Sequence, residues 1–286
     1  MKNRITLATR RSALAMAQAR LAAEHLGRRW PDSSVALLEL VTTGDRQQDW
    51  SLEKQGGKGL FTGELEQALL RGEADAAVHS CKDLPTTLGE GLALAGFLPR
   101  ERPNDVLVLR EGCEAPAVLA TGSPRRRAQA ARLFPDTEWR EIRGNVETRL
   151  RKIAEGYADG TILAAAGLRR LGIRERADLR FRELTTAEMV PAPGQGAIAL
   201  ECPASSVEAL RPALDSRTGA QVRAERAFLA ALGGGCHAAF AAHCSGEWLE
   251  IFHEKTGYQR APLAVEDDGI EEAVRALVKE LGLESG

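Results

Sequence analysis

Residues 78–85 read VHSCKDLP and join a buried strand to a group of polar side chains. From residue 74 on, the preceding side chains are small or β-branched, which predicts a strand that runs up to Asp83. Within a few residues the stretch places a hydroxyl, an ammonium and a carboxylate before Pro85, which ends strand pairing. Polar groups at the carboxyl end of a strand in an α/β protein face the crevice where ligands bind. The stretch therefore predicts an α/β fold with a candidate site at Asp83, against the plainer alternative of a charged exit from a strand.

The chain on either side of this stretch alternates between strand and helix patterns. Ser12 is placed to cap the first helix, whose apolar residues recur at helical spacing. A long loop rich in glycine and charge, residues 42–60, is typical of a lid or a binding loop. The alternation predicts a parallel sheet, with strands at 5–9, 35–41, 74–83 and 92–98 and helices at 12–28 and 64–71.

Two proline-containing segments, 99–103 and 190–194, bracket a second α/β unit. After them, residues 197–201 have the pattern of a buried strand that returns to the first sheet. Two connections of this kind make a hinge with a cleft between two lobes. The second unit is predicted to hold strands at 106–109, 118–121, 138–142 and 161–165, helices at 124–133 and 146–155, and a turn at 167–171.

The length of 286 residues fits two or three domains. We expect the first to comprise residues 1–98 and 194–217, and the second residues 99–193. Residues 218–286 are expected to form a small α+β third domain, with helices at 222–232 and 270–281 and short strands between 243 and 252.

The composition is that of a globular protein, with 44% hydrophobic and 27% charged residues. Neither an apolar signal core nor a membrane-length apolar segment is present, so the expected compartment is the cytoplasm. Five cysteines, an odd number without CxxC spacing, indicate reduced thiols and no disulfide framework.

Basic residues are concentrated in residues 99–189, where 17 of 18 are arginine. The planar guanidinium matches a carboxylate or a phosphate in a bidentate way, which a lysine does not. The same segment carries 14 acids and no interleaved aromatic platform, so nucleic-acid binding is the less favoured interpretation.

These arginines follow three predicted strand-to-helix turns, at 121–127, 143–149 and 167–170. Helix N-termini attract anions, and such turns of one parallel sheet face the same side. The first lobe adds Arg10 and Ser12 in a fourth turn, and Lys54 and Lys58 on the long loop. We expect these cationic side chains to bind an anionic ligand and to surround a buried Asp83. For any single arginine, the alternative is a solvated side chain without a ligand.

Three glycines precede Cys236, which gives close backbone access to its sulfur and suits a nucleophile or a covalent attachment point. A metal site is the rival, because Cys236-His237 and His243-Cys244 supply four possible ligands. Their spacing is unlike that of zinc modules, so no metal is expected. A structural cysteine is a further alternative.

Eight segments in order along the chain together resemble one family, porphobilinogen deaminase, also called hydroxymethylbilane synthase. They are ATRRS at 8–12, GGKGLF at 56–61, VHSCKDLP at 78–85, TGSPRRR at 121–127, RGNVETRL at 143–150, AAGLRRLG at 165–172, PGQGAIALE at 193–201 and GGGC at 233–236. The resemblance implies a transferase of haem biosynthesis that joins four porphobilinogen molecules head to tail, releasing ammonia each time, to give the linear hydroxymethylbilane. It also implies two periplasmic-binding-protein-like α/β lobes joined by a double crossover hinge, plus the small α+β domain. The protein is then expected to be a cytoplasmic monomer without nucleic-acid or membrane partners.

The resemblance further assigns roles to residues. Family members carry a covalent dipyrromethane primer, one per chain, on a cysteine that matches Cys236. Asp83, with Lys82, matches the catalytic pair, and Asp83 would stabilise the cation that forms as ammonia departs and steer the ring proton transfers. Positions that would hold the primer are Ser12, Lys58, Ser80, Lys82, Asp83, Thr121, Ser123, Arg125, Arg126, Gly144 and Gln195. Positions that would hold substrate carboxylates are Arg10, Lys54, Arg143, Arg149 and Arg170.

The chain departs from the family pattern at two points. The family usually has a proline three residues after the cysteine, whereas Ala239 stands there in this chain. The third domain is also short. A hinged solute-binding protein is the alternative from another functional class, because an anion-lined cleft between two lobes would serve it as well.

Overall fold

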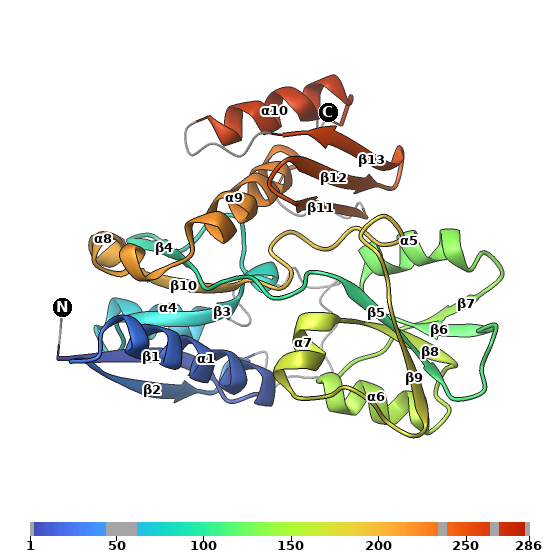
Figure 1. Cartoon of the computed structure of the whole chain (residues 1–286), viewed down its shortest axis with the longest axis horizontal. Coiled ribbons are helices and arrows are strands. Elements are labelled where there is room, and N and C mark those ends of the chain that lie inside the picture. The colour runs from blue at the N-terminus through green and yellow to red at the C-terminus, as the bar shows by residue number, and fades with distance from the viewer. Residues whose placement is uncertain (1–2, 44–61, 234–238, 264–268, 284–286) are drawn as a thin grey trace. The chain divides into compact units, whose positions relative to one another are not determined.

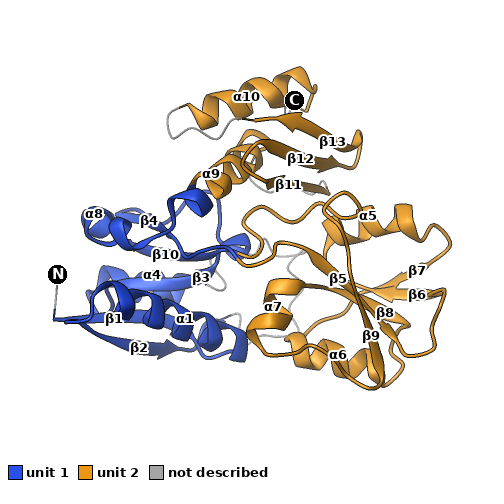
Figure 2. Ribbon diagram, viewed as in Figure 1, with its two compact units in different colours: residues 1–100, 197–219 blue, residues 101–196, 220–286 orange. Residues whose placement is uncertain are grey.

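The computed structural model describes residues 3–43, 62–233, 239–263 and 269–283 (Figure 1). The elements group into two compact units, residues 1–100 with 197–219 and residues 101–196 with 220–286 (Figure 2). The chain therefore leaves the first unit after Arg100 and returns to it at Ala197, as expected of a double crossover. Residues 220–286 group with the second unit, and their standing as a domain of their own stays a prediction.

The first unit is built on a five-stranded sheet with the order β2-β1-β3-β10-β4. The strand predicted to return from the second unit is confirmed as β10, which pairs with β3 and β4. The prediction of a purely parallel sheet is wrong, because β10 enters from the opposite end and runs antiparallel to both neighbours. The strands are β1 (Arg4–Arg10), β2 (Ser34–Leu40), β3 (Ala76–Ser80), β4 (Leu92–Phe97) and β10 (Ile198–Pro203).

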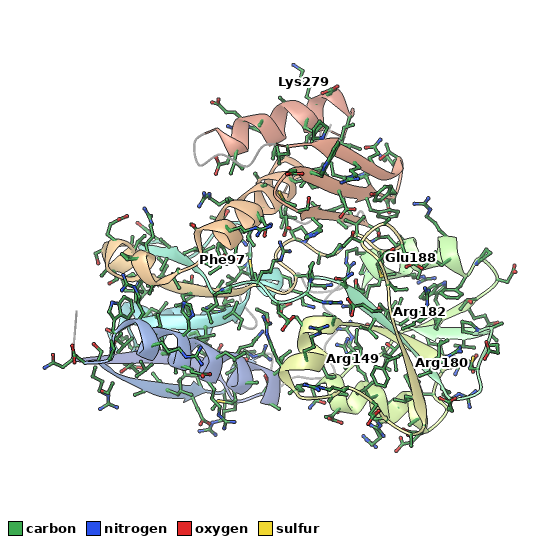
Figure 3. The ribbon with its side chains drawn as sticks, in the orientation of Figure 1. Phe97, Arg149, Arg180, Arg182, Glu188 and Lys279 are labelled. Carbon is green, nitrogen blue, oxygen red and sulfur yellow. The ribbon has the colours of Figure 1, made fainter. Side chains whose placement is uncertain are left out.

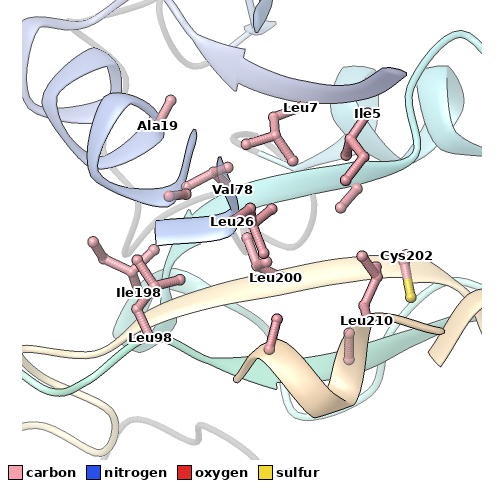
Figure 4. Packing of buried hydrophobic residues seen from close by; sticks show 14 of the residues in the cluster. Ile5, Leu7, Ala19, Leu26, Val78, Leu98, Ile198, Leu200, Cys202 and Leu210 are labelled. Atoms are coloured by element: carbon pink, nitrogen blue, oxygen red, sulfur yellow. The ribbon is translucent and has the colours of Figure 1, made fainter. Parts of the chain in front are cut away.

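Helices pack on both faces of this sheet. On one face α1 (Ala13–Arg29) buries Ala19 and Leu26 against Leu7, Val78 and Leu200 (Figure 4). On the other face α4 (Gly63–Leu70) contributes its buried leucines to a cluster with alanines of β1 and β3. The short α8 (Val207–Leu210) lies between two 3-10 turns, Ala204–Ser206 and Arg211–Ala213.

The strand that was predicted to reach Asp83 ends at Ser80, and a 3-10 turn, η1 (Cys81–Asp83), follows it. The Leu84 backbone N–H donates to the Cys81 carbonyl at 3.1 Å and closes this turn. The Cys81 N–H donates to the carbonyl of Ala197, also at 3.1 Å. Lys82 and Asp83 therefore project from a tight turn at the carboxyl end of β3.

The second unit contains a five-stranded sheet with the order β7-β6-β8-β5-β9. Strand β6 is parallel to β7 and β8, whereas β5 is antiparallel to β8 and β9. The strands are β5 (Asp105–Arg110), β6 (Val118–Ala120), β7 (Glu138–Arg140), β8 (Gly160–Ala164) and β9 (Leu179–Glu183). Since β6, β7 and β8 share one direction, their carboxyl ends lie at one edge, as the sequence predicted for the three arginine-bearing turns.

Three helices follow those strand ends, α5 (Pro124–Leu133), α6 (Val146–Ala154) and α7 (Ala165–Arg170). The turn predicted at 167–171 is thus wrong, because the small residues after β8 continue into a short helix. Strand β9 was not predicted. It is a short edge strand in which only two apolar residues, Leu179 and Phe181, alternate with exposed charged side chains, so its pattern is weak.

The remaining part of the second unit is a three-stranded antiparallel sheet covered by helices. Its strands β11 (Phe240–Cys244), β12 (Trp248–His253) and β13 (Gly257–Pro262) pair in chain order. Helix α9 (Ser216–Ala231) begins six residues before the predicted start at 222, and α10 (Ile270–Glu280) closes the described chain. Phe228, Ile251 and Val274 are buried together in one apolar cluster.

Within the described ranges, no helix combines the length and the apolar character that crossing a membrane requires.

Asp159 fixes the start of β8 through its carboxylate. One oxygen accepts a hydrogen bond from Arg110 Nη2 at 2.7 Å, and the other accepts from the Ala117 and Val118 N–H groups at 2.9 Å each. The Arg110 hydrogen bond, and then the Val118 N–H, hold the pKa of Asp159 below its ordinary value. The folded chain therefore stabilises the ionised form.

We expect Asp159→Asn to lower the free energy of unfolding by about 2 kcal/mol at neutral pH. Because the pKa is lower in the folded chain, this stabilisation is complete above the unfolded value of about 3.9 and is lost as the pH falls further. Urea unfolding of both proteins should show a difference that shrinks below about pH 4. Asp136→Asn, at an exposed position of the same unit, is the control. A difference that did not change with pH would contradict the assignment.

Candidate active site

A pocket opens in the first unit where β1 and β3 end and α1 begins. Its cavity volume is about 70 Å³. Four of the residues predicted from sequence come together in its wall, from two separate segments of the chain. The lining residues are Arg10, Ser12, Leu14, Ala15, Gln18, Thr62, Val78, His79, Ser80 and Asp83.

Hydrogen bonds fix the two serines of this pocket. Ser12 caps α1, and its Oγ accepts from the Ala15 N–H at 3.3 Å. Gln18 Nε2 donates to Ser80 Oγ at 2.8 Å, and the Ser80 hydroxyl can donate to Gln18 Oε1 at 3.1 Å. Gln18 was missed by the sequence interpretation. A signal for it exists, because it is a polar residue on the buried face of α1, between Ala15 and Ala22.

Asp83 lies at this pocket, but its side chain is exposed, as is that of Lys82. The expectation of a buried carboxylate is therefore wrong for the described part of the chain. A hydrated carboxylate on a tight turn can still approach a cation that develops in the pocket. Such a preorganised opposite charge lowers the energy of a cationic transition state.

In the second unit, Arg125 and Arg126 form a buried cluster with Asp105. Arg125 Nη2 lies 2.7 Å from Asp105 Oδ2, and Arg126 Nη2 lies 2.8 Å from Oδ1. Gln195 Nε2 donates to the same Oδ1 at 3.0 Å and to the Pro103 carbonyl at 2.6 Å. Arg125 Nη1 also donates to the Val190 carbonyl at 2.7 Å. The segment that enters the second lobe and the segment that leaves it therefore both contact this cluster around the Asp105 carboxylate.

Thr121 and Ser123 hold the turn that leads into this cluster. Thr121 Oγ1 accepts from the Ser123 N–H at 3.1 Å. Ser123 is the N-cap of α5, and its Oγ accepts from the Arg126 N–H at 3.4 Å. The start of α5 and the two arginines are therefore fixed as one piece.

The cluster carries more positive than negative charge, since Asp105 is shared by two guanidinium groups. Burial, as the largest cause, and the neighbouring Arg126 lower the pKa of Arg125, while Asp105 acts in the opposite direction. The guanidinium group remains protonated in proteins, so the cluster keeps a buried positive charge that Asp105 does not balance. A bound anion would balance that charge.

The turn at 143–149 is organised around Gly144. Its φ of +113° is a conformation that favours glycine, and a Cβ there would lie 2.6 Å from Thr148 Cγ2. Arg149, labelled in Figure 3, donates from Nε to the Gly144 carbonyl at 2.7 Å. Arg143 Nε donates to the exposed Glu141 at 2.7 Å. Asn145 caps α6 by accepting from the Thr148 N–H at 2.8 Å.

Arg170, at the end of α7, donates from Nη2 to the Gly196 carbonyl at 2.6 Å. Burial lowers its pKa to about 10, so it stays protonated at neutral pH. Gly196 has a φ of +87°, and a Cβ there would lie 2.3 Å from the Glu101 carbonyl oxygen. The two crossing segments of the second unit therefore touch backbone to backbone, and Arg170 binds one of them.

The chain is similar to known proteins over most of its length. Residues 5–211 match the family model described as "Porphobilinogen deaminase, dipyromethane cofactor binding domain". The porphobilinogen deaminase of Sorangium cellulosum is 47% identical over 85% of this chain and 83% of its own length. That of Desulforudis audaxviator is 47% identical over 82% of this chain and 78% of its own.

The chain belongs to the porphobilinogen deaminase family. The sulphonate-binding protein SsuA of Escherichia coli is also similar in structure, at 12% identity and a TM-score of 0.45 over 99% of this chain and 89% of its own. The predicted class, two α/β lobes with a small α+β part, is confirmed by the sheets themselves.

Membership also confirms the activity that the motifs indicated. The chain is a transferase that condenses porphobilinogen, with release of ammonia, to hydroxymethylbilane, and its cofactor is dipyrromethane. Three of the predicted site residues, Cys236, Lys54 and Lys58, lie outside the described residues.

The four described cysteines of this porphobilinogen deaminase family member are not joined in disulfide bonds. Cys81, Cys202 and Cys244 are buried. Burial raises the pKa of Cys202 to about 11, and burial followed by the charge of Asp159 raises the pKa of Cys113. Thiols with raised pKa values are poor nucleophiles. Within the described residues, no three His, Cys, Asp or Glu side chains are grouped as metal ligands.

Asp105 is the second functional residue that the sequence interpretation missed. In sequence it is one acid at the start of the strand-forming run 105–109, next to a proline-containing crossing. A signal could have been found in the fact that a charge at the buried start of a strand needs a partner.

Proposed function

We propose that Asp83, assisted by Lys82, is the catalytic carboxylate of hydroxymethylbilane synthesis. The observation that supports this role is its place in the pocket beside Arg10, Ser12 and Ser80. When the C–N bond of porphobilinogen breaks, the electron pair leaves with ammonia and the substrate carbon becomes positive. The negative charge of Asp83 would stabilise that cation, and Arg10 would bind a substrate carboxylate.

The dipyrromethane cofactor fits the charge of these residues. Arg125 and Arg126 share one buried acid, so their surplus positive charge suits a carboxylate-bearing group. When bound, dipyrromethane supplies the pyrrole carbon to which the first substrate unit is joined. We place its side chains against Ser12, Lys58, Ser80, Lys82, Thr121, Ser123, Arg125, Arg126, Gly144 and Gln195, with Asp83 facing its rings and Cys236 as the thioether residue.

Substrate carboxylates are proposed to bind Arg10, Lys54, Arg143, Arg149 and Arg170. The contact of Arg143 with exposed Glu141 supports this role, because a solvated ion pair contributes little and exchanges readily for a ligand carboxylate. Arg170 donates a hydrogen bond to the Gly196 carbonyl, so the position of that backbone segment would affect how Arg170 binds a carboxylate.

The predicted three-domain division, with boundaries at 1–98 plus 194–217, 99–193 and 218–286, remains part of this proposal. We also propose a cytoplasmic monomer; the described cysteines form no disulfides, which supports the compartment. Sedimentation at several protein concentrations should give the mass of one chain, 30.8 kDa plus the cofactor.

Two substitutions that change the net charge of the cluster of Asp105, Arg125 and Arg126 in opposite directions test cofactor binding. Arg126→Gln should leave most of the purified chain without the cofactor mass, because losing one charge-assisted contact weakens binding by about 1.5–3 kcal/mol. Asp105→Asn, which raises the net positive charge, should retain the cofactor. Both substitutions remove part of the same buried ion pair, so both should lower the melting temperature.

Arg127→Gln is the matched control, because Arg127 is the next residue of α5 and is exposed. Intact mass should show full loading in this variant. Equal loading in Arg126→Gln and Asp105→Asn would mean that the cluster is purely structural and would contradict its role as a carboxylate site.

A further inference from the structure

The turn between β7 and α6, residues 141–145, is held in place by side chains. Strand β7 is the edge strand of its sheet, so its outer side meets no other strand of the described chain. Backbone carbonyl groups at such an edge need donors from elsewhere. Arg143, proposed above to bind a substrate carboxylate, lies in this turn. The groups that fix the turn therefore also determine where its guanidinium can reach.

Two carbonyl groups of the turn accept hydrogen bonds from residues that come later in the chain. Tyr157 Oη donates to the Glu141 carbonyl at 2.8 Å. Lys152 Nζ donates to the Arg143 carbonyl at 3.3 Å. The next carbonyl of the turn is held by a side chain of α6, as described above. Tyr157 is the donor from outside the helix, so it joins the end of β7 to the segment that follows α6.

Tyr157 contacts the end of β7 through its backbone as well as its side chain. Its carbonyl accepts a hydrogen bond from Arg140 Nη1 at 2.8 Å, while its hydroxyl donates to the adjacent Glu141. Two cations also lie over its ring, with Arg140 Cζ 6.0 Å and Lys152 Nζ 5.8 Å from the ring centroid. Cations are attracted to the negative face of an aromatic ring. The ring therefore has a defined place between β7 and α6.

Glu141 connects this tyrosine to the substrate-binding arginine. Its carbonyl accepts from Tyr157, and its carboxylate accepts from Arg143 Nε at 2.7 Å. Ile142, between the two, is 1% exposed and belongs to the apolar cluster beneath the sheet. That buried side chain fixes the place of the turn, and the Tyr157 hydroxyl adds the orientation of the Glu141 peptide group.

We propose that Tyr157 is a positioning residue for substrate binding and acts through Glu141 and Arg143. Its hydroxyl orients Glu141, whose carboxylate holds the Arg143 guanidinium in the place where a substrate carboxylate binds. Binding exchanges the Glu141 carboxylate for that of porphobilinogen, while Tyr157 keeps the turn in position. A guanidinium that is already in place loses less conformational freedom on binding, which strengthens binding. The inference rests on the substrate role proposed for Arg143.

A purely structural tyrosine is the competing explanation, and exposure separates the two. The Tyr157 residue is 41% exposed, so its hydroxyl should contribute little to the stability of the fold. A structural role predicts a lower melting temperature and an unchanged KM. A positioning role predicts the reverse.

The test measures ammonia release by cofactor-loaded wild type and Tyr157→Phe over a range of porphobilinogen concentrations. The substitution removes the hydroxyl and keeps the ring. It should raise KM about fivefold, as expected for one hydrogen bond. The value of kcat should stay at that of wild type, because the arginine contact is made in the ground state and in the transition state alike. Tyr157→Leu, which also removes the ring, should raise KM roughly tenfold.

A double substitution shows whether the hydroxyl acts through the arginine. Arg143→Gln should raise KM about tenfold or more, because it removes a charge-assisted contact. Adding Tyr157→Phe to Arg143→Gln should then raise KM no further, since residues that act through one contact are not additive. Independent, additive increases in KM would overturn the inference.

Tyr258→Phe is the matched control, because it removes the hydroxyl of the second of the two tyrosines of the chain. That hydroxyl donates to the Glu250 carboxylate at 3.1 Å, and its loss should leave KM unchanged. A wild-type KM in Tyr157→Phe, with a raised KM in Arg143→Gln, would overturn the inference alone. A wild-type KM in Arg143→Gln would overturn it together with the substrate role of that arginine. Loss of folded protein in Tyr157→Phe would also overturn it, because the hydroxyl would then be structural.

Discussion

Asp83→Ala should carry bound dipyrromethane and yet release ammonia from porphobilinogen roughly 10³-fold more slowly than wild type. The substitution removes the carboxylate that η1 presents at the pocket, while Ser12 and Ser80 keep their own hydrogen bonds. Since Asp83 is exposed, losing it should cost little stability. Intact mass, melting temperature and ammonia release measured on the same preparation would separate loading, folding and chemistry.

Two further variants show whether charge is the property that matters at position 83. Asp83→Asn keeps the size of the side chain and removes its charge, so it should be nearly as slow as Asp83→Ala. Glu73→Gln is the control, because Glu73 is an exposed carboxylate of the same unit, held by Arg71 away from the described pocket. Ammonia release at the wild-type rate in Asp83→Ala or Asp83→Asn would refute the role given to Asp83.

Local patterns were sufficient to predict much of the secondary structure. Helix α5 begins and ends where predicted, at Pro124 and Leu133, because a capping serine followed by proline marks its start. The return of β10 to the first sheet could also be predicted, from a buried strand that follows a proline-rich crossing. Its antiparallel direction could not, because direction depends on where the chain re-enters the sheet.

The candidate site was predicted less completely, and the reason lies in pairing between distant residues. Arginine-rich turns indicated carboxylate binding, but Asp105 lies about twenty residues before its two arginines, and Gln195 lies 90 residues after it. Contacts of this kind depend on strand order, which the periodicity of a single segment does not contain.

Cys236→Ser should abolish turnover completely, because the resemblance places the covalent link to the cofactor at this thiol. Wild-type protein is expected to exceed the mass of its chain by two condensed pyrroles, and the variant should have the mass of the chain alone. A serine hydroxyl is far less nucleophilic than a thiolate, so it should not replace the thioether. Denaturing the protein before mass measurement would separate a covalent cofactor from a bound one.

Cys113→Ser is the matched control for this experiment. Cys113 is the half-buried thiol among the described cysteines, and its raised pKa makes it a poor nucleophile at neutral pH. It should therefore keep the full added mass and wild-type ammonia release. Added mass that survived denaturation in Cys236→Ser would place the link on another residue, and active wild type without added mass would rule out a covalent primer. Loss of the mass in Cys236→Ser alone would tie the covalent step to the thiol that follows three glycines and leave Asp83 to the chemistry of each addition.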